Sequence, residues 1–341
     1  MESIAITDFH HSILEPGSKR RWQMHLAESL TGPLTVPLLT CRGHQPGPVM
    51  LVVAGIHGDE FEGMEAMRQV FAQLDPVEMR GTFLAIPIAN PWAYDAQTRE
   101  SPAAVDGKNL ARVFPGRDHG SPTDRLASHL FQFVLRNLTA ADLLIDLHSG
   151  GTRYRYLPMV GYRDIDGPAL APSIEAARHF GLDRVWIMPG SPGPLSAETA
   201  RAGIPTIGTE ITGQGGCLRD DVTVYASGIL NCLRYKGILQ GSSPARSTAK
   251  ARATQWLDVT QHGVFLPAVD LGSDVTKGQL LATVVDNYGE VRAEIRAEHD
   301  GEIWALRTFP TGTSQRYRIC DGAMMTDDSV TETKVSPQGM R

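Results

Sequence analysis

The sequence predicts an α/β protein with a mostly parallel, mixed sheet and helices on both faces, followed by a small all-β domain. From about residue 46, short apolar runs typical of buried strands alternate with segments whose apolar residues recur at helical spacing. Such alternation requires crossover connections, which make neighbouring strands parallel and cover both faces of the sheet. After residue 254 the pattern changes to short apolar stretches and glycine turns, which predicts the β domain.

The expected elements follow in chain order. Two short strands near the N-terminus are expected to form an antiparallel pair at a sheet edge, at 22–28 and 34–40. The later strands are expected at 49–55, 81–89, 142–147, 185–188 and 204–210. The helices are expected at 60–74, 122–138, 171–181, 196–202 and 219–236. Pro122 suits a first helical position, where its missing N–H costs no hydrogen bond.

Composition shifts predict the domain boundaries. Residues 1–240 are expected to form the α/β domain, with the N-terminal strands in its first 45 residues. Residues 241–254 are polar and basic and are expected to form a linker. A β-barrel or sandwich domain is expected at 255–325, and a disordered tail at 326–341.

Composition also narrows the function classes. The chain has 341 residues, with 32 basic and 38 acidic side chains and a net charge of −6, so nothing indicates nucleic-acid binding. Its longest apolar stretch, 48–56, is far shorter than the roughly 20 residues of a membrane span. The first twenty residues lack the apolar core of a signal peptide, and the four cysteines form no CxxC pair. We therefore expect a cytoplasmic enzyme or binding protein, and leave a homo-oligomer open.

Polar side chains stand where two predicted strands end. His57 and Glu60 follow the strand at 49–55, and His148 follows the strand at 142–147. Ligands bind at the carboxyl ends of parallel strands in open α/β sheets. Two imidazoles and one carboxylate are a common ligand set of catalytic zinc. An HxxE pair alone is more often structural, but the coincidence of polar groups at three strand ends, the third being that of Glu210, predicts one Zn²⁺ per chain. Cobalt, manganese and iron are alternatives.

A further carboxylate, Glu210, ends the strand at 204–210. A carboxylate beside a metal that it does not ligate can act as a general base. The alternative is a surface or helix-capping carboxylate. The coincidence of three strand ends with polar groups favours the catalytic interpretation.

A long connection at 89–122 shows neither helix nor strand character and carries Arg99, Asp106, Asn109 and Arg112. Irregular connections of this length in compact domains are usually functional or disordered. Arginines beside a metal suit an anionic substrate, because one can hold a carboxylate while another stabilises an oxyanion. The alternative is a solvated basic loop.

The ordered motifs GIHGDEFEG, Asn90-Pro91, DGKNLARVFPG, DLHSGG and TEITGQGG resemble the succinylglutamate desuccinylase/aspartoacylase family of zinc carboxypeptidase-like hydrolases. The resemblance spans most of residues 50–325. It implies that zinc is bound by His57, Glu60 and His148, and that Glu210 is the general base and acid. It also implies that Arg99 polarises the scissile carbonyl, and that Arg112 with its neighbours, Asn109 among them, holds the substrate carboxylate.

One position departs from the family pattern. Where the family often has Asn-Leu-Asn-Arg before Phe-Pro-Gly, this chain has Ala111 in place of the second asparagine. The substrate of any one member is therefore not inherited. The DLHSGG form and the N-terminal strands look closer to the branch containing the N-acetyl-diaminobutyrate deacetylase.

We therefore expect a zinc-dependent amidohydrolase that removes a small acyl group from an anionic N-acyl amino acid or a similar metabolite. The resemblance also implies that the C-terminal domain narrows the mouth of the site. Two alternatives remain open. One is a zinc carboxypeptidase acting on peptides, which needs an open cleft. The other is a non-enzymatic anion-binding protein, in which Glu210 would be dispensable.

Overall fold

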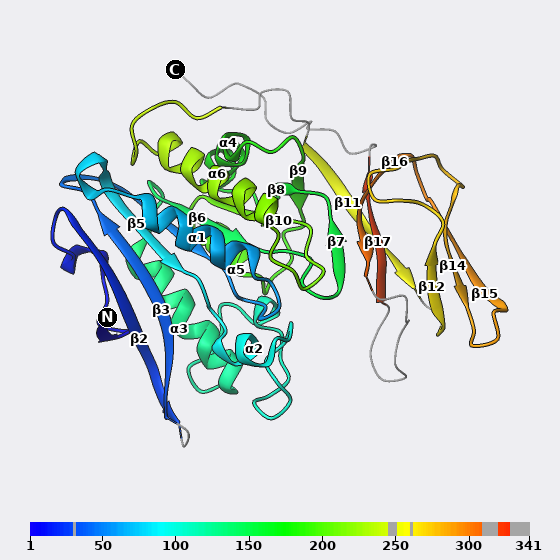
Figure 1. Cartoon of the computed structure of the whole chain (residues 1–341), viewed down its shortest axis with the longest axis horizontal. Coiled ribbons are helices and arrows are strands. Elements are labelled where there is room, and N and C mark those ends of the chain that lie inside the picture. Colours follow the sequence, from blue (N-terminus) through cyan, green and yellow to red (C-terminus); the bar gives the residue numbers. More distant parts are fainter. Residues whose placement is uncertain (30–31, 245–250, 260–261, 309–319, 328–341) are drawn as a thin grey trace.

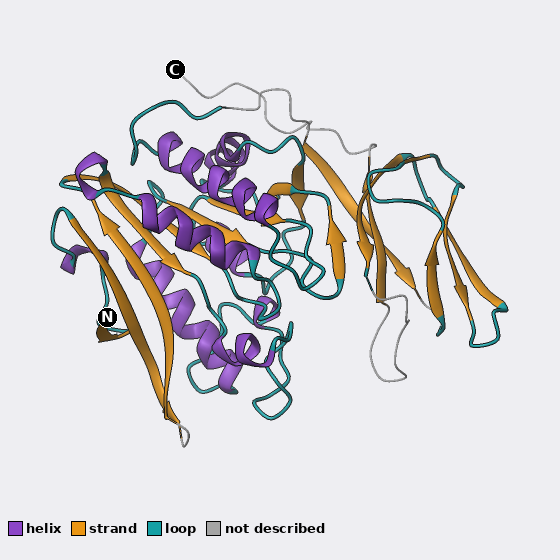
Figure 2. Ribbon diagram, in the orientation of Figure 1, coloured by secondary structure: helices purple, strands orange, loops and turns teal. Residues whose placement is uncertain are grey.

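The computed structural model describes residues 1–29, 32–244, 251–259, 262–308 and 320–327. Within these ranges the strands form one fourteen-stranded sheet and one three-stranded sheet. Helices cover both faces of the central part of the large sheet (Figure 2). The predicted α/β class, with a mixed and mostly parallel sheet, is confirmed.

The large sheet begins with ten strands from the first 210 residues. They are β1 (Glu2–Ala5), β2 (Ser18–Ser29), β3 (Gly32–Arg42), β4 (Gln45–Val53), β5 (Arg80–Ile86), β6 (Leu143–Leu147), β7 (Tyr154–Tyr156), β8 (Met159–Arg163), β9 (Val185–Met188) and β10 (Thr206–Glu210). The helices are α1 (Glu62–Gln73), α2 (Pro91–Ala96), α3 (Pro122–Asn137), α4 (Leu170–Phe180), α5 (Leu195–Arg201) and α6 (Arg219–Tyr235).

The order of strands brings distant parts of the chain together. Along the sheet the strands run β1-β2-β3-β5-β4-β6-β10-β8-β9 (Figure 1). Strands β5, β4, β6 and β10 are parallel to one another. Strand β8 runs antiparallel to β10, which makes the sheet mixed. Because β4, β6 and β10 are parallel neighbours, their carboxyl ends lie at one edge of the sheet.

Side chains of β4 alternate between two hydrophobic cores. Met50 and Val52 pack in the core formed with α1, α4 and α6, whereas Val49, Leu51 and Val53 pack in the core formed with α3 and α5. Successive residues of a strand point to opposite faces, so a strand that is covered on both sides needs a continuous apolar run. This requirement explains the continuous apolar run from which the strand was predicted.

The C-terminal part is built from strands alone in the residues described. These are β11 (Ala251–Val259), β12 (Val264–Pro267), β13 (Asp274–Val275), β14 (Leu280–Val285), β15 (Val291–Arg296), β16 (Gly301–Arg307) and β17 (Cys320–Asp327). Strands β11, β17, β16 and β13 continue the large sheet beyond β9, while β12, β14 and β15 form the small antiparallel sheet.

Three expectations about the chain need correction or restriction. Residues 251–254, expected in the linker, begin β11, because Ala251–Ala253 pair with Val185–Ile187 of β9. The connection at 89–122 contains the short helix α2, whose Ala93 amide is capped by the Asn90 side chain. The expected tail at 326–341 lies outside the described residues apart from its first two, which belong to β17. The division into domains stays a prediction.

Among the described residues, no helix has the length and apolar character needed to cross a bilayer.

Candidate active site

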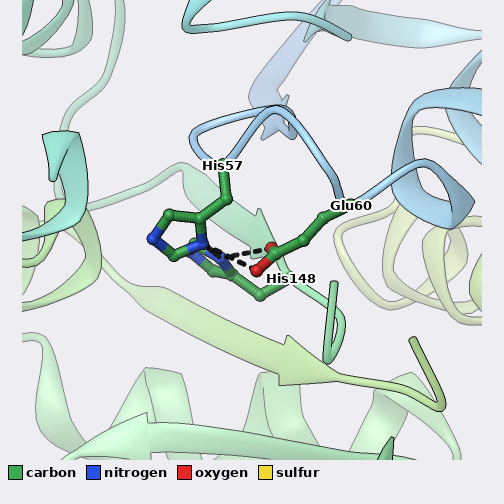
Figure 3. A group of neighbouring side chains, drawn as sticks. All are labelled: His57, Glu60 and His148. Carbon is green, nitrogen blue, oxygen red and sulfur yellow. Dashed lines mark hydrogen bonds and ion pairs between the residues drawn. The ribbon is translucent and has the colours of Figure 1, made fainter. Parts of the chain in front are cut away.

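Three side chains converge at the carboxyl ends of β4 and β6, as Figure 3 shows. His57 Nδ1 lies 2.7 Å from Glu60 Oε1, and His148 Nδ1 lies 2.8 Å from Glu60 Oε2. The two Nδ1 atoms are 3.2 Å apart. The side chains of His57 and Glu60 are buried, with 2% and 3% of their surface exposed, and that of His148 is 13% exposed. The three residues predicted to bind metal are thus brought together in one cluster.

The outer ring nitrogens of both histidines face oxygen atoms. His57 Nε2 lies 3.1 Å from Asn109 Oδ1, and the same oxygen accepts a hydrogen bond from the Ala111 amide. His148 Nε2 lies 3.3 Å from Asp146 Oδ1. Oxygens so placed hold the imidazole proton on Nε2 and leave the lone pair on Nδ1.

The positions of these nitrogen and carboxylate atoms indicate that the cluster suits a cation. With protons on both Nε2 atoms, two Nδ1 lone pairs and the Glu60 carboxylate face one another at contact distance, and that is unfavourable without a positive charge between them. The donor set, two imidazole nitrogens and one carboxylate, is a common one for catalytic zinc. The residues therefore fit a divalent metal such as zinc.

The charges around the cluster lead to the same conclusion. Burial lowers the pKa of His148, but the charges of Asp146 and Glu60 outweigh burial and raise it well above the usual value. Burial and then the Arg99 charge lower the pKa of His57 to about 4. Without metal, a proton on His148 compensates the surrounding carboxylates. A bound cation would replace that proton.

Backbone and side-chain contacts hold the cluster from behind. The Ser149 amide donates to Glu60 Oε2 over 3.1 Å, and the Ser149 hydroxyl donates to Glu62 Oε2 over 2.7 Å. The Tyr225 hydroxyl donates to the carbonyl oxygen of His148. These contacts join α1, α6 and the end of β6, so the packing of two helices fixes the positions of the ligands.

The cluster opens into a cavity of about 450 Å³, within the size range of small-molecule sites. Four of the residues predicted for the site line it besides the two histidines: Arg99, Asn109, Arg112 and Glu210. Arg99 Nη1 donates to Glu60 Oε1 over 2.9 Å, beside the proposed metal position. Glu60 does not line the cavity, but it contacts both histidines that do. The structure thus brings all seven predicted residues to one place.

Glu210 ends β10 and has a buried oxygen, Oε2, with no hydrogen-bond partner in the described part of the chain. Burial, and after it the negative charge of Glu60, raise the pKa of Glu210 to about 8. A carboxyl group with such a pKa can both accept and release a proton near neutral pH.

The loop residues differ from one another in what they contact. Asn109 was predicted to bind substrate, but its side-chain oxygen is already engaged by His57 and by the Ala111 amide. Asp106 accepts hydrogen bonds from Ser121 and Thr123 at the start of α3 and does not line the cavity. Arg112 is exposed at the cavity mouth, with one guanidinium nitrogen on the Ala111 carbonyl oxygen.

Further cavity residues were missed from the sequence. Tyr154 and Tyr156 of β7 pack against Trp256 of β11, with ring centroids 5.3 and 6.2 Å away, and all three line the cavity. We call these three residues the aromatic wall. Nothing in the sequence could link Trp256 to the site, because it lies beyond the expected linker. Asp146 could have been recognised from the sequence as a candidate site residue, since it stands two residues before the predicted metal ligand His148.

Comparison with known proteins adds the family. The family model described as the succinylglutamate desuccinylase/aspartoacylase catalytic domain matches residues 46–236. An N-alpha-acetyl-L-2,4-diaminobutyric acid deacetylase from Halomonas elongata is 30% identical over 297 residues, which cover 84% of this chain and 85% of that protein.

Solved structures share the fold over nearly the whole chain. A succinylglutamate desuccinylase/aspartoacylase from Rhodobacter sphaeroides superposes with a TM-score of 0.81 at 26% identity, over 92% of this chain and 96% of that one. The ectoine utilization protein EutE (DoeB) from Ruegeria pomeroyi, in a product-bound structure, gives a TM-score of 0.80 at 24% identity over the same shares.

Proposed function

Because the chain belongs to the succinylglutamate desuccinylase/aspartoacylase family, we propose that it is a zinc-dependent amidohydrolase that removes a small acyl group from an N-acyl amino acid. The names of the family and of the Halomonas relative support deacylation. The observation that carries the proposal is the convergence of two Nδ1 lone pairs and a carboxylate beside the cavity that also holds Glu210.

His57, Glu60 and His148 would hold the metal. When bound, zinc supplies a Lewis acid that polarises the amide carbonyl and makes water acidic enough to lose a proton near neutral pH. Asn109 and Asp146 keep the two imidazoles in the tautomer that binding requires, through the contacts at their Nε2 atoms.

Glu210 moves the proton in this account. Its carboxylate takes a proton from the attacking water and then gives it to the nitrogen of the departing amine. The burial that raises the pKa of Glu210 to about 8 makes its carboxylate a stronger base, which favours the first of these two transfers. Its Oε2, which has no hydrogen-bond partner among the described residues, leaves an oxygen ready for this contact.

Positive charges bind the anionic parts of the substrate and transition state. Arg99 lies against Glu60, and its guanidinium would stabilise the oxyanion that develops on the carbonyl oxygen. Arg112 at the mouth, and Arg163 deeper in the same cavity, would hold the substrate carboxylate.

The cavity favours a small substrate over a peptide. Its volume of about 450 Å³ suits an N-acyl amino acid, and the aromatic wall narrows it from the side of β7 and β11. A carboxypeptidase must admit a long chain on the acyl side. A wall that includes Trp256, from the C-terminal strands, argues against that alternative.

The proposal is tested with zinc-loaded full-length protein and a panel of N-acetyl and N-succinyl amino acids, by measuring released amine. We expect hydrolysis by the wild type and a loss of at least about 1,000-fold in kcat for Glu210→Gln, because proton transfer is lost in both steps. Zinc binding by the variant confirms that its site is intact. If Glu210→Gln keeps full activity, or if no member of the panel is hydrolysed, the proposed function is wrong.

A further inference from the structure

Tyr156 of the aromatic wall is held close to the end of β10 by backbone contacts. Its amide donates to the carbonyl oxygen of Thr212 over 3.2 Å, and Thr212 follows Glu210 by two residues. The preceding residue of β7 forms an antiparallel bridge to the residue after Thr212. On its other edge β7 pairs with β16, where Tyr156 is in register with Ala305. Contacts on both edges of β7 therefore fix where Tyr156 lies relative to Glu210.

Aromatic packing fixes the ring of Tyr156, which is only 6% exposed. The ring lies edge-on to Trp256, at 89° with 6.2 Å between the centroids, and 5.9 Å from the ring of Tyr154. Met159 and Trp304 belong to the same buried cluster. A group held in this way needs no reorganisation when it contacts a reacting molecule, which is what makes a donor effective in catalysis.

The hydroxyl group of Tyr156 has no hydrogen-bond partner in the described part of the chain. A buried tyrosine usually has one, as Tyr225 does when it donates to the carbonyl oxygen of His148. Tyr156 lines the cavity, and surrounding protein atoms do not seal off its hydroxyl oxygen. This hydroxyl is therefore a donor that a bound molecule can use.

Two charged groups of the proposed mechanism interact with this hydroxyl. Burial, and after it the negative charge of Glu210, raise the pKa of Tyr156 well above its usual value, although the charge of Arg99 lowers it. The hydroxyl therefore keeps its proton at neutral pH. Among the described residues no hydrogen bond joins Tyr156 to Glu210, whose Oε2 has no partner. Holding Glu210 in place is thus not the role of the hydroxyl.

The oxyanion of an amide hydrolysis calls for more than one donor from the protein. Arg99 is partly committed, because its Nη1 already donates to Glu60 Oε1 over 2.9 Å. Tyr156 lines the same cavity as Arg99 and interacts with it electrostatically. A neutral hydroxyl can be buried there without a counter-charge, whereas a second cation would need one.

We propose that Tyr156 is a catalytic residue whose hydroxyl donates a hydrogen bond to the oxygen of the scissile carbonyl as that oxygen becomes an oxyanion. The inference rests on the proposed function and adds to it a second protein donor beside Arg99. The phenol keeps its proton throughout, and Glu210 carries the proton that is transferred. The hydrogen bond strengthens as negative charge develops, so its loss lowers kcat more than it raises KM.

The test is Tyr156→Phe, which removes the hydroxyl and keeps the ring of the aromatic wall. It uses zinc-loaded full-length protein and the N-acyl amino acid that the wild type hydrolyses fastest. We expect kcat to fall by about 100-fold and KM to change by less than about threefold, as for loss of one oxyanion donor. Zinc content should equal that of the wild type. Tyr288→Phe, the same change at a tyrosine that is 93% exposed between β14 and β15, should leave both constants unchanged.

A transition-state analogue separates catalysis from ground-state binding. The probe is the phosphonamidate of the same amino acid, in which a tetrahedral phosphoryl group replaces the scissile carbonyl. In Tyr156→Phe its inhibition constant should rise by about the factor by which kcat falls. In a structure of the wild type with this probe bound, the Tyr156 hydroxyl oxygen should lie about 2.5–3.0 Å from a phosphoryl oxygen. This measurement needs no variant, so misfolding cannot hide the result.

The opposite results overturn the inference. If Tyr156→Phe keeps full kcat, or changes KM alone, the hydroxyl does not act in the transition state. If kcat falls only together with zinc content, Tyr156 supports the metal site instead. A hydroxyl that lies beyond hydrogen-bond distance from the bound phosphonamidate also contradicts the proposal. In each case hydrolysis by the wild type leaves the proposed function standing, whereas a wild type that hydrolyses no N-acyl amino acid removes that function as well.

Discussion

Nδ1 of His57 lies 3.2 Å from Nδ1 of His148, although 91 residues separate the two histidines in the chain. Strands β4 and β6 are parallel neighbours, and each delivers its histidine just beyond its carboxyl end. With Nε2 facing Asn109 on one ring and Asp146 on the other, both Nδ1 lone pairs turn toward Glu60. This geometry is the basis of the metal site and of the predictions below.

Asn109 is expected to act on the metal through His57. Asn109→Ala removes the oxygen that faces His57 Nε2 and frees the ring to rotate or change tautomer. Loss of such outer contacts typically weakens metal affinity by about 10- to 100-fold. Competition with a chelator measures the change, and Asn109→Asp, which keeps an oxygen, should retain most of the affinity. An unchanged zinc affinity in Asn109→Ala would contradict this role.

Metal affinity is expected to rise with pH between about 6 and 8. In the metal-free protein His148 holds its proton, because the charges of Asp146 and Glu60 outweigh burial and raise its pKa, and burial raises the pKa of Glu210 to about 8. A cation displaces these protons, so each released proton strengthens binding by about tenfold per pH unit. Zinc titrations at several pH values measure the slope. Glu210→Gln should flatten it, and a pH-independent affinity of the wild type would show that no proton is displaced.

Arg99 is expected to matter more for the transition state than for substrate binding. Its guanidinium contacts Glu60 Oε1 at 2.9 Å, beside the proposed metal position. Arg99→Met should lower kcat by about 100- to 1,000-fold, as loss of an oxyanion donor does, with a smaller effect on KM. Steady-state kinetics on zinc-loaded protein separates the two constants. A rise in KM alone would assign Arg99 to the binding of the substrate carboxylate.

Asp124 is expected to stabilise the fold above pH 4. It accepts from Lys108 at 2.9 Å, Arg117 at 2.7 Å and the Ser121 amide at the start of α3. Burial raises its pKa, but the hydrogen bonds from Lys108 and Arg117 outweigh burial and lower it to about 2. A lowered carboxyl pKa stabilises the fold above the unfolded value near 4, and this contribution is lost as the pH falls toward 2.

The Asp124→Asn variant measures that contribution. We expect its free energy of unfolding at pH 7 to be about 1 kcal/mol lower than that of the wild type. The figure is modest because Lys108 is partly exposed, Arg117 is largely exposed, and the helix start keeps Ser121. Denaturant unfolding at pH 7, 5 and 3.5 gives the comparison. The difference from wild type should hold between pH 7 and 5 and shrink at pH 3.5. A difference that grows on acidification would contradict the assignment.

The strands that carry the site could be predicted because burial on both faces requires a continuous apolar run in the sequence. From Val49 to Val53 strand β4 is buried on both faces and must be apolar, so the polar His57 just beyond it stands out. The same contrast marks His148 and Glu210. The short helix α2 was missed, since six residues show too little periodicity, and its cap Asn90 is recognisable only in the folded chain.

Other features depend on contacts between distant segments. Trp256 reaches the cavity because β11 joins the large sheet beside β9, and no local pattern shows that pairing. The family resemblance implied that Asn109 binds substrate, and its contact with His57 appears only once the loop is placed against β4.

The most direct test of the metal site is the zinc content of the purified protein and of His148→Ala, measured by elemental analysis after loading and dialysis. His119→Ala, at an exposed histidine outside the cluster, is the matched control. We expect about one zinc per chain in the wild type and the control, and a loss of most of it in His148→Ala. A wild type that takes up no zinc, or a His148→Ala variant that holds as much as the wild type, would contradict the metal site and the hydrolysis built on it.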